Sequence, residues 1–254
     1  MNRTNTYFIS DCHLGGGYIA DRRAHEARVV RFLDHIKDDA AALFLVGDIL
    51  DYWYEYRTVV PRGYVRFLGK LAELADAGVR ITWVTGNHDV WLFDYLRDEI
   101  GLTVQRQAAV VDVDGTPFLI SHGDDVGHQS LKYRMMKACF TSRLCQWLYA
   151  SVHPRWTYKL ATGWSTNNRT TRSAEAEERE KGPAAEELLR YVHEHHAKNP
   201  EVNHYVFGHL HLARLDEIDG VQVAFLGDWI CQDTYAVYDG NQLSLHHFTD
   251  NNPT

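Results

Sequence analysis

Cysteine is scarce in this sequence, and long apolar runs are absent. The four cysteines in 254 residues form no CxxC pair and follow no regular spacing. Such a set is typical of reduced thiols in a reducing compartment, and it argues against a disulfide-stapled scaffold. No run approaches the ~18 consecutive apolar residues of a membrane-spanning helix, and the N-terminus lacks the apolar core of a secretion signal. We therefore expect a cytoplasmic protein without a transmembrane segment.

Internal repeats and low-complexity linkers are absent as well. A length of 254 residues allows one large domain or two small ones, and we expect a single domain over residues 1–254. Hydrophobic residues make up 45% of the chain and charged residues 24%, which gives ample apolar material for a core. The formal net charge is −8, so the composition predicts no nucleic-acid partner. Nothing in the composition specifies an oligomeric state.

One stretch, residues 126–174, contains no acidic residue at all. Because it carries eight basic residues and the whole chain has a net charge of −8, the remainder must carry −16. Three of the seven tryptophans also lie in the stretch. Its basic residues are Lys132, Arg134, Lys137, Arg143, Arg155, Lys159, Arg169 and Arg172. A basic and aromatic stretch within an acidic protein indicates a separate functional unit.

The same stretch has apolar residues at spacings of three and four, which predicts a helix with an apolar face. These residues are Met135, Met136, Phe140, Leu144, Trp147, Leu148 and Val152. An apolar face among cations favours an anionic partner, such as a phosphate-rich substrate or a membrane surface. The alternative is that the face packs on the core and the basic residues are a solvated rim.

The rest of the chain reads as β-α units followed by antiparallel strands. Helices are expected at Arg22–Lys37, Val65–Leu74 and Ala184–His196 from their apolar periodicity. Strands are expected at Tyr7–Ser10, Ala42–Val46, Arg80–Thr85, Ala109–Val113, Pro117–Ser121, His204–Phe207, Ala213–Ile218, Val221–Leu226, Tyr235–Tyr238 and Leu243–Phe248. This order predicts a mixed α/β fold with two sheets and flanking helices.

Five polar clusters each follow directly after a predicted strand. They are Asp11-x-His13, Gly47-Asp48-x-x-Asp51, Gly86-Asn87-His88-Asp89, Ser121-His122-Gly123 and Gly208-His209-x-His211. Loops outside the carboxyl ends of strands usually build binding sites. Turn formation or helix capping explains any one of these residues by itself, but five such clusters in this order favour a shared site.

The donor set of these clusters is chemically selective. It consists of carboxylates, imidazoles and one amide oxygen, and it contains no thiolate. Such ligands suit hard or borderline divalent metals rather than a cysteine-type structural zinc site. The pattern therefore predicts a divalent-metal site.

With these motifs the chain resembles the calcineurin-like metallophosphoesterase superfamily from Asp11 to His211. The resemblance implies a four-layer α-β-β-α sandwich in which a helical cap, residues 125–173, is inserted after His122-Gly123. It also implies two metal ions bridged by Asp48. One would be held by Asp11, His13, Asp48 and His211, and the other by Asp48, Asn87, His122 and His209.

Two such ions together bind the phosphoryl group and activate the attacking water. The resemblance makes Asp48 and His88 the expected catalytic residues, His88 by contacting the phosphoryl oxygen or assisting the leaving group. Asp51 and Asp89 would either orient metal ligands or only hydrogen-bond within their loops, and the sequence leaves both readings open.

The basic, aromatic cap and the segment Phe225-Leu226-Gly227-Asp228-Trp229 resemble more narrowly the UDP-2,3-diacylglucosamine hydrolases of lipid A synthesis. That family implies hydrolysis of a nucleotide-linked acylated sugar, UDP-2,3-diacylglucosamine, to UMP and 2,3-diacylglucosamine 1-phosphate, with water attacking the α-phosphorus. Manganese is the expected metal, and the enzyme would sit peripherally on the inner membrane. The expected substrate-binding residues are Asn87, His88, Ser130, Asn168, Arg169, Arg172 and His209.

The sequence departs from that family at three places. Known members carry Arg where this chain has His88 and Thr where it has Leu210, and the paired acidic site of their cap is not evident near Ser130. Two alternatives stay open: a metallophosphoesterase for another nucleotide diphosphate or phosphodiester, and a non-catalytic interaction module on the same fold. If the cap's apolar face packs against the rest of the protein, a non-lipid substrate is favoured. If the protein binds no metal, the interaction module is favoured.

Overall fold

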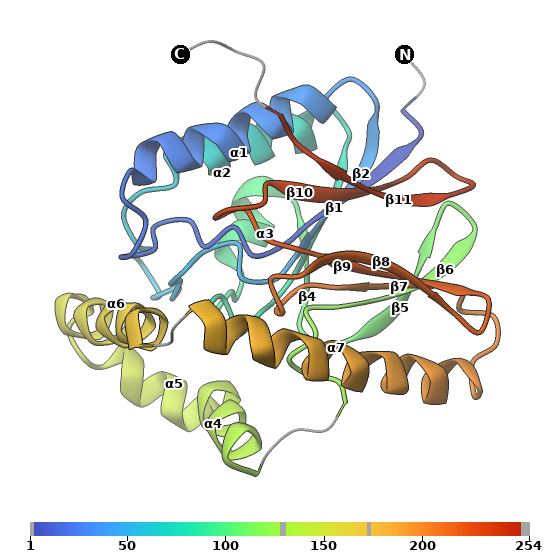
Figure 1. The fold of residues 1–254 in the computed structure, drawn as a ribbon. Helices are drawn as coiled ribbons and strands as arrows, with labels where there is room; N and C mark the ends of the chain where they lie inside the picture. Colours follow the sequence, from blue (N-terminus) through green and yellow to red (C-terminus); the bar gives the residue numbers. More distant parts are fainter. Residues whose placement is uncertain (1–2, 128–130, 172–173, 250–254) are drawn as a thin grey trace.

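A computed structural model describes residues 3–127, 131–171 and 174–249. Two sheets lie face to face at its centre, and helices cover their outer faces (Figure 1). The six-stranded sheet has the order β11-β10-β1-β2-β3-β4, and the five-stranded sheet has the order β5-β6-β7-β9-β8. The predicted mixed α/β fold with two sheets is confirmed.

The strands of both sheets have the following bounds. The six-stranded sheet contains β1 (Asn5–Ile9), β2 (Ala40–Val46), β3 (Arg80–Val84), β4 (Thr103–Gln105), β10 (Thr234–Tyr238) and β11 (Leu243–His247). The five-stranded sheet contains β5 (Ala109–Val113), β6 (Thr116–Ser121), β7 (His204–Phe207), β8 (Ala213–Ile218) and β9 (Val221–Leu226).

Seven helices accompany these strands in the described part of the chain. They are α1 (Arg22–Ile36), α2 (Val65–Asp76), α3 (Tyr95–Ile100), α4 (Leu131–Thr141), α5 (Arg143–Ala150), α6 (Pro154–Thr171) and α7 (Ala174–His196). Helices α1 and α2 cover the six-stranded sheet, α7 runs along the five-stranded sheet, and α4–α6 gather to one side of the sandwich (Figure 1). None of the helices described combines the length and the apolar character needed to cross a bilayer.

Three apolar clusters hold the four layers together. Phe32 and Phe67 belong to the cluster under α1 and α2, Phe8 and Phe118 to the cluster between the two sheets, and Val192 to the cluster under α7. Burial of such side chains stabilises the fold by about 25 cal/mol per Å² of apolar surface removed from water. The sandwich is thus held by three separate apolar interfaces.

The strand directions bring the polar clusters to one end of the sandwich. Strands β1, β2 and β3 pair in parallel, as do β6, β7 and β9. The carboxyl ends of parallel strands lie at the same edge of a sheet. The loops that follow Ile9, Val46, Val84, Ser121 and Phe207 therefore open at the edge where the sequence places the metal site.

Some elements differ from the sequence prediction. Helix α3 and strand β4 were not expected, because six and three residues are too few to give a periodic signal. Helix α7 begins at Ala174 and contains Pro183 in its interior, whereas a start at Ala184 was expected. The eight residues before Gly182 are Ala, Glu, Arg and Lys, all good helix formers, and they outweigh the break expected at Pro183.

The cap differs from the prediction in a similar way. The apolar face expected over 135–152 is divided between α4 and α5, because Ser142 has an extended backbone between them. All four cysteines are free, and the Cys139 and Cys145 sulfurs lie 3.5 Å apart across this break.

The interface between the two sheets should be highly sensitive to truncation. Phe118 is fully buried and stacks on Phe8, with ring centroids 5.8 Å apart. We expect Phe118→Ala to lower the free energy of unfolding by about 3–5 kcal/mol, because it removes apolar contacts and leaves a cavity. Urea unfolding followed by circular dichroism measures this loss. Val110→Ala on the neighbouring strand is the control, since Val110 is 47% exposed; an equal loss in both variants would contradict the assigned core.

Candidate metal centre

The loops that carry the predicted ligands have an unusual backbone. Five of the seven predicted ligands have positive φ angles between 45° and 67°. They are Asp11, His13, Asp48, His209 and His211. The left-handed region is costly for residues with a side chain, and such conformations persist where the surrounding structure enforces them, often at functional sites. The fold thus holds these loops in conformations that aim their side chains at one place.

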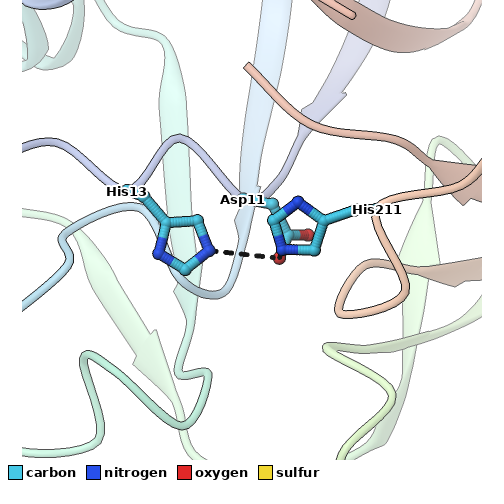
Figure 2. Close-up of side chains that lie close together, drawn as sticks. All are labelled: Asp11, His13 and His211. Atoms are coloured by element: carbon cyan, nitrogen blue, oxygen red, sulfur yellow. Dashed lines mark ion pairs between the residues drawn. The ribbon is translucent and has the colours of Figure 1, made fainter. Parts of the chain in front are cut away.

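Asp11, His13 and His211 form one group of potential ligands. The Oδ1 atom of Asp11 lies 3.2 Å from His211 Nε2 and 3.7 Å from His13 Nε2. The two imidazole rings are nearly parallel, with centroids 5.2 Å apart. Figure 2 shows the carboxylate of Asp11 beside both rings. Although Asp11 and His211 are 200 positions apart, the two sheets bring them together.

Asp48, His122 and His209 form a second group, in which the potential ligand atoms all lie within 4.8 Å of one another. Asp48 Oδ2 is 3.3 Å from His122 Nε2 and 3.8 Å from His13 Nε2 of the first group. One carboxylate oxygen therefore faces both groups. This is the position that a bridging ligand between two cations requires.

Three buried polar atoms of the predicted ligands have no hydrogen-bond partner within the described structure. They are Asp11 Oδ1, Asn87 Oδ1 and His122 Nε2. Buried polar atoms are rarely left unsatisfied, because desolvation without a partner costs about 1–3 kcal/mol each. All three atoms are of the donor types that bind divalent metals. The residues present therefore fit a metal centre.

The motif glycines allow the ligand loops to approach one another. A Cβ atom on Gly86 would lie 2.6 Å from the Asp48 backbone nitrogen and would overlap the Asp48 carboxylate. One on Gly208 would lie 2.8 Å from Asp11 Oδ2 and would overlap the Ser10 hydroxyl. Only glycine fits where a backbone passes this close to a ligand.

Hydrogen bonds from outside the centre orient its histidines. His13 Nδ1 lies 3.2 Å from Asp51 Oδ1, and Tyr18 donates to the same oxygen over 2.9 Å. His211 Nδ1 lies 3.3 Å from Asp228 Oδ2. A carboxylate on Nδ1 leaves Nε2 directed at the metal and fixes the ring. Asp51 thus orients a predicted ligand, which is one of the two roles that the sequence left open.

Asp228 contacts a predicted ligand, although the sequence predicted no role for it. Gly227-Asp228 follows strand β9 in the same way that Gly47-Asp48 follows strand β2. This shared pattern could have identified Asp228 as a candidate. Its other oxygen accepts the backbone N–H groups of Ile230 and Cys231. The carboxylate is therefore fixed from one side while it holds His211 from the other.

Asp89 has the second of the two roles that the sequence left open, because it forms hydrogen bonds with the surrounding loops and not with a predicted metal ligand. It accepts the backbone N–H groups of Gly86 and Ile49 and the indole N–H of Trp83. Burial, together with the negative charge of Asp48, raises the pKa of Asp89 to about 6. No predicted ligand side chain is among these partners. Asp89 thus joins two ligand-bearing loops without orienting a metal ligand itself.

His88 lies at the open side of the centre. Its side chain is 23% exposed, and its Nε2 atom is 4.0 Å from Asp48 Oδ2. Its Nδ1 atom lies 2.9 Å from the Asp51 carbonyl oxygen. The ring is therefore fixed at Nδ1, with Nε2 on the side of the bridging carboxylate.

The carboxylates of the centre are ionised at neutral pH. Burial is the largest single effect and raises the pKa of Asp48, but the neighbouring imidazoles, His122 first, together outweigh it and hold the pKa well below the usual range. Burial acts in the same direction on Asp11, and the charge of His211 again lowers the pKa. Burial is the largest single effect on His122 and lowers its pKa, whereas the nearby carboxylates, Asp48 first, together raise the pKa well above its usual value. A cation that binds His122 Nε2 must therefore displace a proton.

The remaining predicted substrate residues lie in the cap. Ser130 and Arg172 fall outside the described residues. Asn168 and Arg169 belong to α6, but their side chains are not described.

A cleft of about 410 Å³ leads from the metal centre to the cap. Asn87 and Asp124 line it on the side of the sandwich, and Met136, Lys137 and Phe140 line it on the side of α4. The cations Arg106 and Arg143 also face this cleft. Its combination of apolar and cationic walls suits an anionic substrate with apolar parts.

The fold and this site define a class of protein. The sequence matches the calcineurin-like phosphoesterase family over residues 4–232, and the chain belongs to that family. The chain is therefore a metal-dependent hydrolase that uses divalent metals.

Particular relatives can also be named. A protein named UDP-2,3-diacylglucosamine hydrolase from Porphyromonas gingivalis is 44% identical over 98% of this chain and 99% of its own. One of the same name from Nitrosococcus oceani is 25% identical over 88% of this chain and 87% of its own. The solved structure of an archaeal phosphodiesterase has a TM-score of 0.46 at 14% identity and covers 95% of this chain and 98% of that one.

The hydrogen bond from Asp228 to His211 should affect metal affinity. We expect Asp228→Asn to weaken divalent-metal binding about 10- to 100-fold, because the amide no longer supports His211 with a negative charge. Isothermal titration of the metal-free protein with Mn²⁺ measures this change. Asp239→Asn, in an exposed hairpin turn, is the matched control. Unchanged affinity in Asp228→Asn would show that Asp228 does not act on the centre.

Proposed function

We propose that this chain hydrolyses the diphosphate of UDP-2,3-diacylglucosamine, giving UMP and 2,3-diacylglucosamine 1-phosphate for lipid A synthesis. The observation that carries the proposal is the convergence of two groups of buried ligand atoms on the Asp48 carboxylate. The 44% identity with a UDP-2,3-diacylglucosamine hydrolase supports the substrate.

In this proposal two ions, Mn²⁺ in the native enzyme, are held by seven residues. Asp11, His13, Asp48 and His211 hold one ion. Asp48, Asn87, His122 and His209 hold the other. The unsatisfied buried atoms of Asp11, Asn87 and His122 support this division, and oxygen and imidazole donors are suited to Mn²⁺.

Two divalent ions in such a site activate water and neutralise the charge that develops on the phosphoryl group. The residues of this chain would supply the rest. Asn87, His88 and His209 would contact the phosphoryl oxygens, and Asp48 would keep the two groups of ligands in register. The position of His88 supports its role, because its side chain is partly exposed and its Nε2 lies 4.0 Å from Asp48 Oδ2. An imidazole there can donate a hydrogen bond or a proton to the leaving oxygen.

The cap, residues 125–173, would hold the acyl chains and contact the membrane. One side of it is bound to the sandwich: Tyr54 donates to the Gln146 carbonyl over 2.7 Å, and Trp91 donates to the Phe140 carbonyl over 2.9 Å. Its apolar side chains are nonetheless largely exposed, including Trp147 at 65%. The other exposed apolar residues are Leu131, Met135, Leu144, Leu148, Val152, Trp156, Tyr158 and Leu160.

This exposure bears on the choice of substrate. If the enzyme acted only on small soluble phosphodiesters, the apolar face would be expected to pack against the sandwich. Exposed apolar side chains together with basic residues favour a lipid surface that carries negative charge. We therefore place the enzyme in the cytoplasm, peripherally attached to the inner membrane.

The first test is hydrolysis of UDP-2,3-diacylglucosamine, compared with UDP-glucose and bis-p-nitrophenyl phosphate, in the presence of Mn²⁺ or EDTA. We expect Mn²⁺-dependent release of UMP from the acylated substrate and a kcat/KM at least about 100-fold lower for UDP-glucose, because acyl chains add apolar binding. Comparable activity on all three would favour the alternative of a general phosphodiesterase.

The metal assignment has its own control in this assay. Asp48→Asn should lose nearly all turnover, because a bridging carboxylate that becomes an amide no longer holds two cations. Metal content measured by elemental analysis should fall in parallel. Wild-type turnover in this variant with metal bound would refute the assignment of two bridged ions.

The membrane role of the cap predicts a separate change. The double variant Trp147→Ser/Leu148→Ser should bind phosphatidylglycerol vesicles at least about tenfold more weakly, because two exposed apolar side chains are lost. Turnover of bis-p-nitrophenyl phosphate should stay the same. Vesicle sedimentation measures the binding, with Val110→Ser as the control for an exposed residue outside the cap. Equal binding by both variants would rule out this face as the membrane contact.

A further inference from the structure

A three-residue cluster joins the metal-binding loops to the cap. Asp124 follows His122-Gly123 and is only 8% exposed. Its Oδ2 atom accepts a hydrogen bond of 2.6 Å from the Tyr133 hydroxyl and one of 2.9 Å from Lys137 Nζ. Tyr133 and Lys137 are four positions apart on α4, so they lie on the same face of that helix. Asp124 thus determines where the first cap helix presents Lys137.

Lys137 lies at the junction of two cavities. It lines the cleft that contains Asn87, and it also lines an adjoining cavity of about 710 Å³ with walls that include Arg190 and Glu187. Its side chain is 28% exposed. A molecule with its reacting group at Asn87 that extends into the adjoining cavity therefore passes Lys137.

Lys137 differs from the other cations of the cleft. Arg106 donates to the Phe93 carbonyl oxygen and lies over the Phe93 ring, and Arg143 is exposed on α5. Lys137 is bonded to Asp124, a carboxylate whose pKa is lowered, against the effect of burial, by the charge of His122 and then of Lys137 itself. Asp124 follows the predicted ligand His122 by two positions, and Lys137 lines the same cleft as the predicted ligand Asn87, so this geometry places Lys137 beside the metal centre.

We propose that Lys137 binds the phosphate that leaves with the sugar, and that Asp124 is its positioning residue. This inference rests on the proposed diphosphate substrate. In the reaction, a bond forms between the water oxygen and the α-phosphorus, and the bond from that phosphorus to the bridging oxygen breaks. The electron pair stays on the bridging oxygen, which departs with the sugar phosphate. An ammonium group has three donors, so one can serve Asp124 while two serve this departing phosphate.

A purely structural role for the cluster predicts a different outcome. If Lys137 only fixes α4 to the sandwich, its loss should reduce turnover of every substrate equally. If it binds the departing phosphate, its loss should affect only substrates that have a second phosphate. Bis-p-nitrophenyl phosphate has a single phosphorus atom and so separates the two cases.

The experiment compares Lys137→Ala with wild type on UDP-2,3-diacylglucosamine and on bis-p-nitrophenyl phosphate, both in detergent with Mn²⁺. We expect kcat/KM for the diphosphate to fall about 10- to 100-fold, since a charge-assisted hydrogen bond is lost. The rate with bis-p-nitrophenyl phosphate should change by less than about twofold. Lys137→Arg should restore most of the lost rate because it keeps the cation, and Lys159→Ala, an exposed cap lysine outside both cavities, should behave as wild type.

Asp124→Asn tests the positioning role. It should reduce the diphosphate rate, and combining it with Lys137→Ala should add little, because residues that act as a unit are not additive. Equal losses on both substrates in Lys137→Ala, or no loss on either, would overturn the proposal.

The failure of the proposed function can be told apart from the failure of this inference. If wild type cleaves UDP-glucose but not the acylated substrate, the proposed substrate is wrong. The same comparison with UDP-glucose then decides the role of Lys137, because the diphosphate is identical. If wild type cleaves no diphosphate, both proposals are refuted.

Discussion

The structure depends on the attraction between buried carboxylates and imidazoles at one end of the sandwich. The protein's own groups do not satisfy all of these polar atoms. Asp11 and Asp48 are buried and ionised; Asp11 lies within 4 Å of two imidazoles and Asp48 within 4 Å of three. Buried charges are tolerated only when they are compensated. Some buried polar atoms of these residues have no hydrogen-bond partner in the described structure, and bound cations would compensate them. The left-handed ligand residues and the closely packed glycines follow from the need to bring these groups together.

The sandwich and the cap differ in what they contribute to the site, because the paired strands of the sandwich hold side chains rigidly. The predicted ligand residues lie directly after strands that are paired within two sheets, so small displacements are resisted by the packed interfaces behind them. The cap contributes apolar and cationic surface, and hydrogen bonds from Tyr54 and Trp91 hold it at the edge of the centre. The predicted metal ligands are thus located in the sandwich, whereas the residues proposed to select a substrate lie on α4–α6.

Much of the fold was predictable because strands of five or more residues carry a clear apolar signal. Strands β8 and β9 have the predicted bounds, and the clusters that follow β1, β2, β3, β6 and β7 meet at one centre. Helix α3 and strand β4 were missed because they are too short, and the start of α7 was misplaced because helix-forming residues outweighed Pro183. The Gly227-Asp228 pair after β9 marks Asp228 as a candidate, but its partner His211 is identified only by contact across the fold.

The sequence by itself determined the chemistry of the centre: which donor types are present, that thiolates are excluded, and that each donor follows a strand. Those properties depend on residue type and local order, which a sequence contains in full. Tertiary structure alone decided which histidine is oriented by which carboxylate, that Asp51 and Asp89 have different roles, and that the cap leaves its apolar residues exposed. These outcomes depend on distances between segments far apart in the chain, and such distances are set only when two sheets pack face to face.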